Sequence, residues 1–153
     1  IIHSASSTNN EYITITDNTI NAGSYGIYFE GNSFSDVESG NVISNNTIVD
    51  FGYQGIYLKY QDAIDVSSNT VTARSNLGIN TNYGIYAAYC KWDCVFAKNR
   101  ITVYGLNENY GLYLDNVDGS QSNEVNINNN FISCSRSSDI SYGMYLYESN
   151  YIY

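Results

Sequence analysis

Three charged side chains in the C-terminal half of the chain have the chemistry of a polysaccharide-cleaving site: Glu108, Asp139 and Arg136. Glycoside hydrolysis needs two carboxyl groups at a defined separation, which Glu108 and Asp139 could supply from neighbouring loops. Arg136 would then serve as a base or as a clamp on the substrate. No sequence motif reinforces this set, and no predicted strand carries a dense group of carboxylates. We therefore expect no catalytic residues and keep a polysaccharide lyase or glycoside hydrolase as the alternative.

Tyrosine is the side chain whose spacing points to binding. The chain has 17 tyrosines, and one occupies the fourth position of each of five similar pentapeptides. Aromatic rings offer flat apolar faces while their hydroxyls keep hydrogen-bonding ability, so a row of them predicts glycan binding. Two other interpretations stay open: ring stacking that only stabilises adjacent strands, by about 0.2–1 kcal/mol a pair, and a packing face for another subunit or domain. The five residues are Tyr28, Tyr57, Tyr86, Tyr113 and Tyr145.

The pentapeptides are of the type Tyr-Gly-Ile-Tyr-Leu, and their glycines are 29, 29, 27 and 32 residues apart. A period in this range is typical of a solenoid, and the alternation of apolar and polar residues in each copy is that of a strand. The residue after each glycine, which is Met144 in the last copy, should therefore face the core, and the tyrosine should face outward. Stacked coils would place the five tyrosines in one file, about 4.8 Å apart and roughly 20 Å long.

A second element lies between the pentapeptides and is centred on an asparagine. Apolar residues stand three before and two after this asparagine in all five copies, which predicts a short strand, a turn and a second strand. Asparagine tolerates the left-handed backbone conformation of a sharp turn, and its amide can bond to the equivalent asparagine of the next coil. The asparagines are Asn18, Asn46, Asn69, Asn99 and Asn130.

Together, these two elements resemble the repeat of the right-handed parallel β-helix family, which includes pectate-lyase-like proteins. The expected fold class is all-β, a single-stranded right-handed parallel β-helix (solenoid) of about five coils with three short strands per coil. We expect one domain over residues 1–153, with coils at roughly 12–40, 41–63, 64–93, 94–122 and 123–153. The resemblance selects no function, because the family includes lyases, hydrolases, epimerases, phage tailspikes, adhesins and stalks. Its lyases hold calcium with carboxylates and use an arginine or a lysine as base.

The connectors before the last three pentapeptides are longer than those before the first two. Residues 73–82, 103–109 and 134–141 would occupy the same corner of consecutive coils and should form a wall beside the tyrosine file. The alternative is that a solenoid simply tolerates insertions at this corner. Three polar side chains of the wall complete the candidate ligand-binding set: Arg74, Asn80 and Asn82.

Composition argues against several partners and favours a place outside the cell. The formal charge of −9, with only six basic residues, disfavours nucleic acid and anionic membranes. No apolar run approaches the roughly 20 residues that membrane insertion requires. A chain with few charged side chains and many hydroxyl and amide side chains suits an extracellular or cell-surface protein that meets sugars. Because it starts without Met and stops just after the fifth glycine strand, we expect a piece of a longer secreted protein whose flanking domains are partners.

Cysteine and acidic side chains give little indication of a metal. The spacing of Cys90 and Cys94 allows a disulfide, but Cys94 and Cys134 stand at inward positions, so we favour buried free thiols. Zinc is not expected, because His3 is the sole histidine. Calcium is the alternative cofactor at two aspartate pairs, although Asx turns are the favoured interpretation there. These pairs are Asp62 with Asp65 and Asp115 with Asp118.

The sequence thus predicts a non-catalytic extracellular module for glycan recognition or surface attachment. Its partner would be a polysaccharide or a cell-surface glycan, and we expect neither a metal site nor a cofactor. The alternatives are the β-helix enzyme described above and a structural stalk without ligand. Homo-oligomers, including trimers, are compatible with such a fold.

Overall fold

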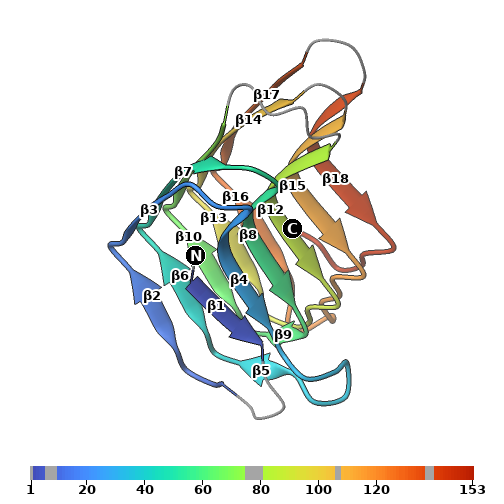
Figure 1. Cartoon of the computed structure of the whole chain (residues 1–153). Helices are drawn as coiled ribbons and strands as arrows, with labels where there is room; N and C mark the ends of the chain where they lie inside the picture. The colour runs from blue at the N-terminus through green and yellow to red at the C-terminus, as the bar shows by residue number, and fades with distance from the viewer. Residues whose placement is uncertain (1, 6–9, 75–80, 106–107, 137–139) are drawn as a thin grey trace.

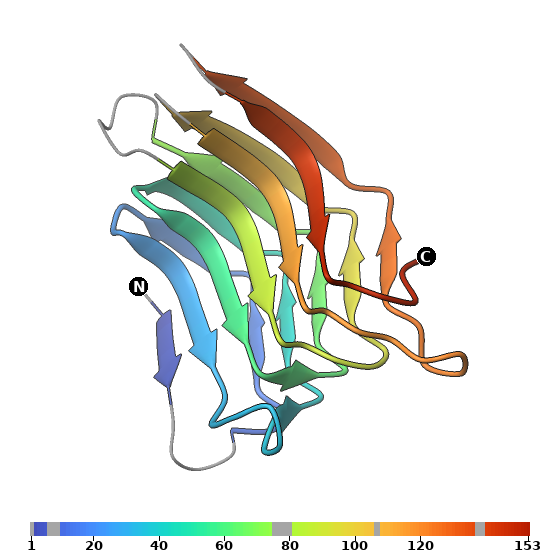
Figure 2. The same ribbon diagram turned by 90° about the vertical axis from the view of Figure 1, so that its right-hand side faces the viewer.

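The chain folds as an all-β parallel β-solenoid of about four turns, which confirms the β-helix predicted from the repeats (Figure 1). The computed structural model describes residues 2–5, 10–74, 81–105, 108–136 and 140–153. Every coil contributes one strand to each of three long sheets, and all strand pairs in these sheets are parallel. Figure 2 shows the coils stacked side by side in chain order. The described part of the chain contains no helix with the length and apolar character that crossing a membrane requires.

Sheet A carries the glycine pentapeptides. In spatial order it consists of β1 (Ile2–Ala5), β4 (Tyr25–Glu30), β8 (Gln54–Lys59), β12 (Thr81–Ala88), β15 (Glu108–Asp115) and β18 (Ser141–Tyr147).

Sheets B and C carry the strands before and after the repeated asparagine. Sheet B consists of β2 (Thr14–Thr16), β6 (Val42–Ser44), β10 (Asp65–Ser67), β13 (Val95–Ala97) and β16 (Asn126–Asn128). Sheet C consists of β3 (Thr19–Asn21), β7 (Thr47–Phe51), β11 (Thr70–Ala73), β14 (Arg100–Gly105) and β17 (Phe131–Arg136). A short fourth sheet pairs β5 (Glu38–Ser39) with β9 (Gln61–Asp62).

The core lies inside the coils, where equivalent apolar residues of successive repeats stack on one another. The residues after the first four pentapeptide glycines are paired in register along sheet A and are fully buried: Ile27, Ile56, Ile85 and Leu112. Sheets B and C face them with similar apolar ladders. Burial of these apolar residues contributes most of the free energy that holds the coils together, because hydrophobic stabilisation scales with the apolar area removed from water.

The pentapeptide glycine is required by packing between coils. A Cβ at Gly26 would lie 2.3 Å from Cγ2 of Ile48 and 2.6 Å from the carbonyl oxygen of Gly55, and the next three pentapeptide glycines show similar collisions. Gly26 and Ile27 are both buried, so the strict alternation of the strand is broken at the glycine. The residues on either side, Tyr25 and Tyr28, therefore both lie on the outer face of the sheet, where their rings contact each other.

The repeated asparagines form a ladder inside the turn between sheets B and C. The Oδ1 atom of each asparagine accepts the backbone N–H of the asparagine one coil earlier, over 2.9–3.1 Å, and this bond recurs four times. The expected left-handed conformation lies elsewhere, because positive φ angles of 55–58° occur at the residue before each asparagine. The asparagine is thus selected for its side-chain hydrogen bonds and not for its backbone conformation.

The last coil differs from the expectation that Met144 belongs to the core. Met144 is 42% exposed and Leu146 is 45% exposed, although their equivalents in earlier coils are buried. The reason is that, among the described strands, β18 pairs with β15 alone, so its inner face has a neighbouring coil on one side. The cysteines follow the favoured interpretation: Cys90 and Cys94 are free and buried, and Cys134 is free and partly buried.

Candidate functional site

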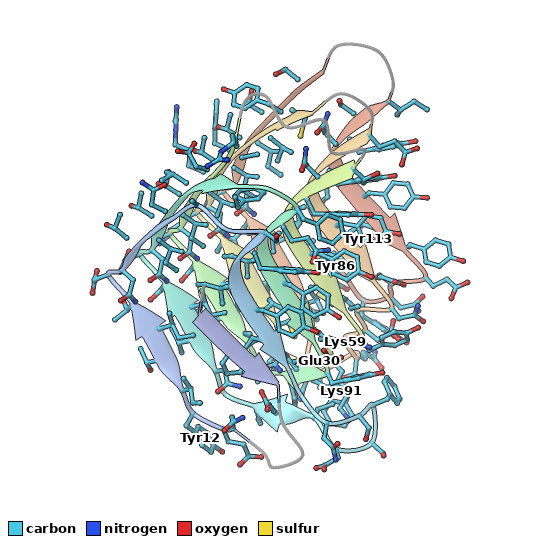
Figure 3. The ribbon with its side chains drawn as sticks, in the orientation of Figure 1. Tyr12, Glu30, Lys59, Tyr86, Lys91 and Tyr113 are labelled. Carbon is cyan, nitrogen blue, oxygen red and sulfur yellow. The ribbon has the colours of Figure 1, made fainter. Side chains whose placement is uncertain are left out.

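The five predicted tyrosines form one stacked column on the outer face of sheet A. Successive ring centroids lie 4.5, 5.5, 5.2 and 5.1 Å apart, and successive ring planes differ by 2–24°. All five are half-buried, and parallel rings at these distances overlap only in part. Figure 3 shows two of them, Tyr86 and Tyr113, projecting from the sheet away from the core. We call this the first column: Tyr28, Tyr57, Tyr86, Tyr113 and Tyr145.

A second column lies beside the first, and the sequence interpretation missed it. Its rings stack in the same way, with centroids 5.0 Å apart for Tyr83 and Tyr110 and 5.1 Å apart for Tyr110 and Tyr142. They meet the first column edge to face, as Tyr83 does with Tyr86 at 5.3 Å. The available signal was the first residue of the pentapeptide, but simple alternation would point that residue inward. The second column is Tyr25, Gln54, Tyr83, Tyr110 and Tyr142.

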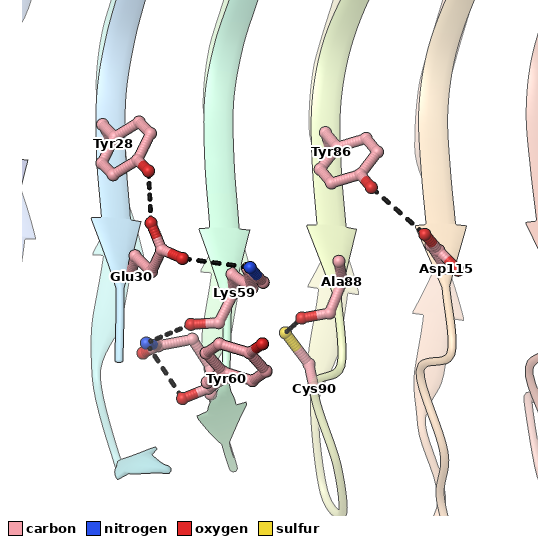
Figure 4. Close-up of polar contacts among 9 residues, drawn as sticks. Tyr28, Glu30, Lys59, Tyr60, Tyr86, Ala88, Cys90 and Asp115 are labelled. Atoms are coloured by element: carbon pink, nitrogen blue, oxygen red, sulfur yellow. Dashed lines mark hydrogen bonds and ion pairs between the residues drawn. The ribbon is translucent and has the colours of Figure 1, made fainter. Parts of the chain in front are cut away.

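The two columns together form a continuous aromatic surface, which we call the tyrosine face. Carboxylates accept hydrogen bonds from its phenols. Figure 4 shows the hydroxyl of Tyr28 donating to Glu30 and that of Tyr86 donating to Asp115, the latter over 3.2 Å. Lys59 forms an ion pair with Glu30, with Nζ and Oε1 3.2 Å apart. The charged groups beside these tyrosines are therefore mainly anionic.

Burial raises the pKa of several phenols of the tyrosine face. It raises the pKa of Tyr28 and that of Tyr83 to about 12, from 10.0, with smaller contributions from nearby acidic groups and phenols. The pKa values of Tyr57 and Tyr86 are raised further, again chiefly by burial. At neutral pH these four tyrosines therefore offer hydroxyl donors and acceptors without phenolate charge.

A small pocket opens between the columns near the N-terminal end of the face. Its volume is about 220 Å³, and six tyrosines and Gln54 line it. Gln54 is only 3% exposed, and its Oε1 has no hydrogen-bond partner among the residues that the structure describes. The tyrosines are Tyr25, Tyr28, Tyr53, Tyr57, Tyr83 and Tyr86.

The candidate residues of the loop wall are only partly brought to this face. Arg74 is exposed directly after β11. Asn82 is 2% exposed, and its amide donates to the carbonyl oxygen of Tyr104 over 2.9 Å, so it has a structural bond inside the wall. Asn80 lies outside the described residues.

Of the three candidate catalytic residues, one side chain is described. Glu108 is exposed and accepts a hydrogen bond from the hydroxyl of Tyr110 over 3.1 Å. Arg136 is the last residue of β17 and pairs with Gly105, and its side chain is not among those that the structure describes. Asp139 also lies outside the described residues. The structure therefore places one carboxylate of the proposed pair, that of Glu108, at the tyrosine face.

Of the two aspartate pairs considered for calcium, Asp115 and Asp118 accept hydrogen bonds, whereas Oδ1 of Asp65 is buried without a partner among the described residues. Asp118 Oδ1 accepts from both the backbone N–H and the side-chain amide of Asn150, each over 3.0 Å. Asp115 accepts from Tyr86 and from the amide of Asn116. Within the described ranges, no three His, Cys, Asp or Glu side chains come together as a possible metal-binding group.

One family model matches almost the whole chain, over residues 2–153. The family is described as NosD, periplasmic copper-binding protein. No curated protein and no solved structure matched the chain. The periplasmic location in this description is consistent with the extracellular or cell-surface location expected from the sequence.

Proposed function

This chain belongs to the NosD family, described as periplasmic copper-binding protein, and we propose that it is a non-catalytic β-helix module that binds neutral polysaccharide in the periplasm. The observation that carries the proposal is the tyrosine face. Stacked tyrosines from five successive coils give one uninterrupted first column. Such binding would attach the protein to a glycan-bearing surface.

The geometry of the face suits a repetitive chain ligand. Equivalent groups recur once per coil, so a polysaccharide lying along the solenoid axis would meet the same ring and hydroxyl at each step. Partly open ring faces can pack against the C–H surface of a sugar, and the neutral hydroxyls can exchange hydrogen bonds with its hydroxyls. The sheet beneath is held by the core and by the asparagine ladder, so little ordering is needed on binding.

Charge selects against acidic glycans. Glu30, Glu108 and Asp115 each accept a hydrogen bond from a phenol of the face, and the nearby cation, Lys59, is paired with Glu30. A polyuronate would place further carboxylates beside these groups, and like charges at an interface are costly. We therefore expect neutral polysaccharides to bind better than polyuronates.

The copper in the family description has no matching donor set among the described residues. They contain no cluster of three potential ligands. Cys90 and Cys94 are soft donors of the kind that copper(I) prefers, but both are buried. Burial raises the pKa of both thiols, that of Cys94 to about 12, whereas metal binding requires the thiolate. The proposed function therefore does not involve copper.

A glycan array on the folded chain tests the proposal, with neutral and uronate polysaccharides as separate arms. The variant Tyr86→Ala/Tyr113→Ala removes two adjacent rings of the first column. The matched control is Tyr104→Ala/Tyr151→Ala, because these tyrosines are 37% and 54% exposed and lie outside sheet A. We expect binding of neutral glycans that the first variant loses and the control keeps, with circular dichroism showing that both variants fold.

Two results would replace the proposal with one of the alternatives. Release of reducing or unsaturated ends from any bound glycan would make the chain an enzyme, and Glu108→Gln would then be the first variant to assay. No binding by the folded chain on a broad array would leave a structural stalk. Equal binding by the two double variants would show that a glycan binds elsewhere than on the tyrosine face.

A further inference from the structure

One residue interrupts the second column. Gln54 pairs in register with Tyr25 on one side and with Tyr83 on the other, so it occupies the place that tyrosine has in the neighbouring coils. An amide side chain is smaller than a phenol ring, and Tyr25 and Tyr83 lie two strand spacings apart, about 10 Å. The substitution therefore leaves a gap in an otherwise continuous aromatic stack.

The gap is the pocket of about 220 Å³ between the columns. Tyr53, from the turn before β8, stands at its side and meets both flanking rings edge to face, at 5.6 Å from Tyr25 and 5.9 Å from Tyr83. Tyr57 of the first column stands on the other side of Tyr25, at 6.2 Å. The walls are thus aromatic on several sides, and Gln54 is the amide among them.

The amide of Gln54 gives the pocket a specific requirement. Its Oε1 is buried and has no hydrogen-bond partner in the described part of the chain. Leaving a buried acceptor unpaired costs about 1–3 kcal/mol, and a ligand with a suitably placed donor would recover that cost. Gln54 lines the pocket, and a rotation of its side chain would be needed to present the buried Oε1 to a ligand there.

We propose that this pocket is an aromatic cage for an organic ammonium group that carries at least one N–H. Cations are attracted to the faces of aromatic rings within about 6 Å of the centroid, and the gap at Gln54 lies between Tyr25 and Tyr83. The first-column rings that line the pocket are stacked on their column neighbours, so the cation would meet chiefly the rings of the second column. The N–H would donate to Oε1 of Gln54. A quaternary ammonium has no N–H, and an anion would find Lys59, a cation described near this face, already engaged by Glu30.

The electrostatics of the surroundings agree with a cationic ligand. Burial raises the pKa of Tyr25, Tyr28 and Tyr83, so these three phenols are neutral when the ligand binds. The chain carries a formal charge of −9, which attracts cations over longer distances. The surface already holds cations over rings elsewhere, with Nζ of Lys59 4.6 Å from the ring centroid of Tyr60.

The ammonium group could belong to a free small amine or to an amino sugar within a glycan. The inference does not depend on the proposed polysaccharide function, because the pocket would hold a free amine equally well. Four probes separate the chemistry and its source: ethylammonium, tetramethylammonium, glucosamine and glucose. Glucosamine and glucose differ only in an amine against a hydroxyl, so each controls for the other.

Isothermal titration calorimetry of the whole chain, at about pH 6 where these amines are protonated, measures binding of each probe. Gln54→Leu keeps the side-chain size and removes the acceptor, and we expect its dissociation constant for the amine to rise about tenfold or more. Gln54→Tyr restores the residue of the neighbouring coils, fills the gap and should abolish amine binding. Unfolding midpoints check that both variants fold.

The outcomes assign the source or overturn the inference. If ethylammonium binds and glucosamine does not, the ligand is a free amine. If glucosamine binds more tightly than ethylammonium, the ligand is an amino sugar. Equal affinity for glucose and glucosamine would refute recognition of an ammonium group. Unchanged affinity in Gln54→Leu would refute the role of Oε1, and no binding of any probe would show that the pocket holds only water. Retained polysaccharide binding by Gln54→Tyr would separate this site from the proposed function.

Discussion

Replacing Asn69 by Leu should destabilise the solenoid more than the same replacement at Asn18. The side chain of Asn69 lies inside the ladder and is 1% exposed. Its Oδ1 accepts the backbone N–H and the side-chain amide of Asn46, over 3.0 and 3.1 Å. Its Nδ2 donates to the carbonyl oxygen of Ile43 over 2.8 Å and to Oδ1 of Asn99 over 3.1 Å. Leucine has a similar size but makes none of these bonds.

The magnitude follows from the backbone groups that lose their partners. The N–H of Asn46 would become unpaired, in a site that leucine keeps dry. The carbonyl oxygen of Ile43 would lose the amide of Asn69, but Ile43 keeps its place in the ladder between β6 and β10. A buried unpaired backbone group costs about 1–3 kcal/mol, which is the expected loss, against the roughly 5–15 kcal/mol by which folded domains are stable.

Asn18 provides the matched control, because it is the first asparagine of the ladder and is exposed. Its amide donates to the carbonyl oxygen of Thr16 over 2.9 Å and to Oδ1 of Asn46 over 3.0 Å. Water can replace the bond to Thr16, and Asn46 still accepts the backbone N–H of Asn18. We expect Asn18→Leu to cost at most about 1 kcal/mol.

Urea unfolding followed by far-ultraviolet circular dichroism measures both free energies, and equal m-values would show that the same transition is compared. If the two variants lie within about 0.5 kcal/mol of each other, the hydrogen-bond argument is refuted. The ladder asparagines would then act through something other than the pairing of buried backbone groups.

Two further predictions concern packing and pH. Gly84→Ala should lower the free energy of unfolding by about 3 kcal/mol or more, because the added Cβ would lie 2.3 Å from Cγ2 of Ile101; Gly143→Ala, whose Cβ would be 3.9 Å from its nearest neighbour, should stay within about 0.5 kcal/mol of the parent. Equal losses in urea titrations would contradict the close-packing account. The folded-state pKa of Tyr28 and that of Tyr83 are raised by burial to about 12, above the ordinary 10.0, so their contribution is complete below pH 10 and is lost as pH rises toward 12. Absorbance at 295 nm should show late-titrating phenols and loss of structure in that interval, and titration of all phenols near pH 10 without unfolding would refute the prediction.

The site was only partly predictable from the sequence. The first column was expected because Tyr28 and its equivalents follow an alternating pattern, which fixes their direction locally. The second column was missed because the same rule points Tyr25 inward. The alternation is interrupted at Gly26, because Gly26 and Ile27 are consecutive and both face the core. The pocket at Gln54 was missed for the same reason, because Gln54 can be recognised as a gap only once the neighbouring tyrosines are known to form a column.

The sequence by itself determined the solenoid, because repeat period, strand alternation and the recurring Gly and Asn are properties of neighbouring residues along the chain. Tertiary structure alone decided what depends on contacts between coils. The side chain of Ile48 occupies the place of a Cβ at Gly26, and this contact turns Tyr25 outward to make the second column. Stacking of coils likewise assigns the left-handed conformation to Ser68 and its equivalents, the residues before the asparagines, because each asparagine is held in the turn by hydrogen bonds to the coils on either side.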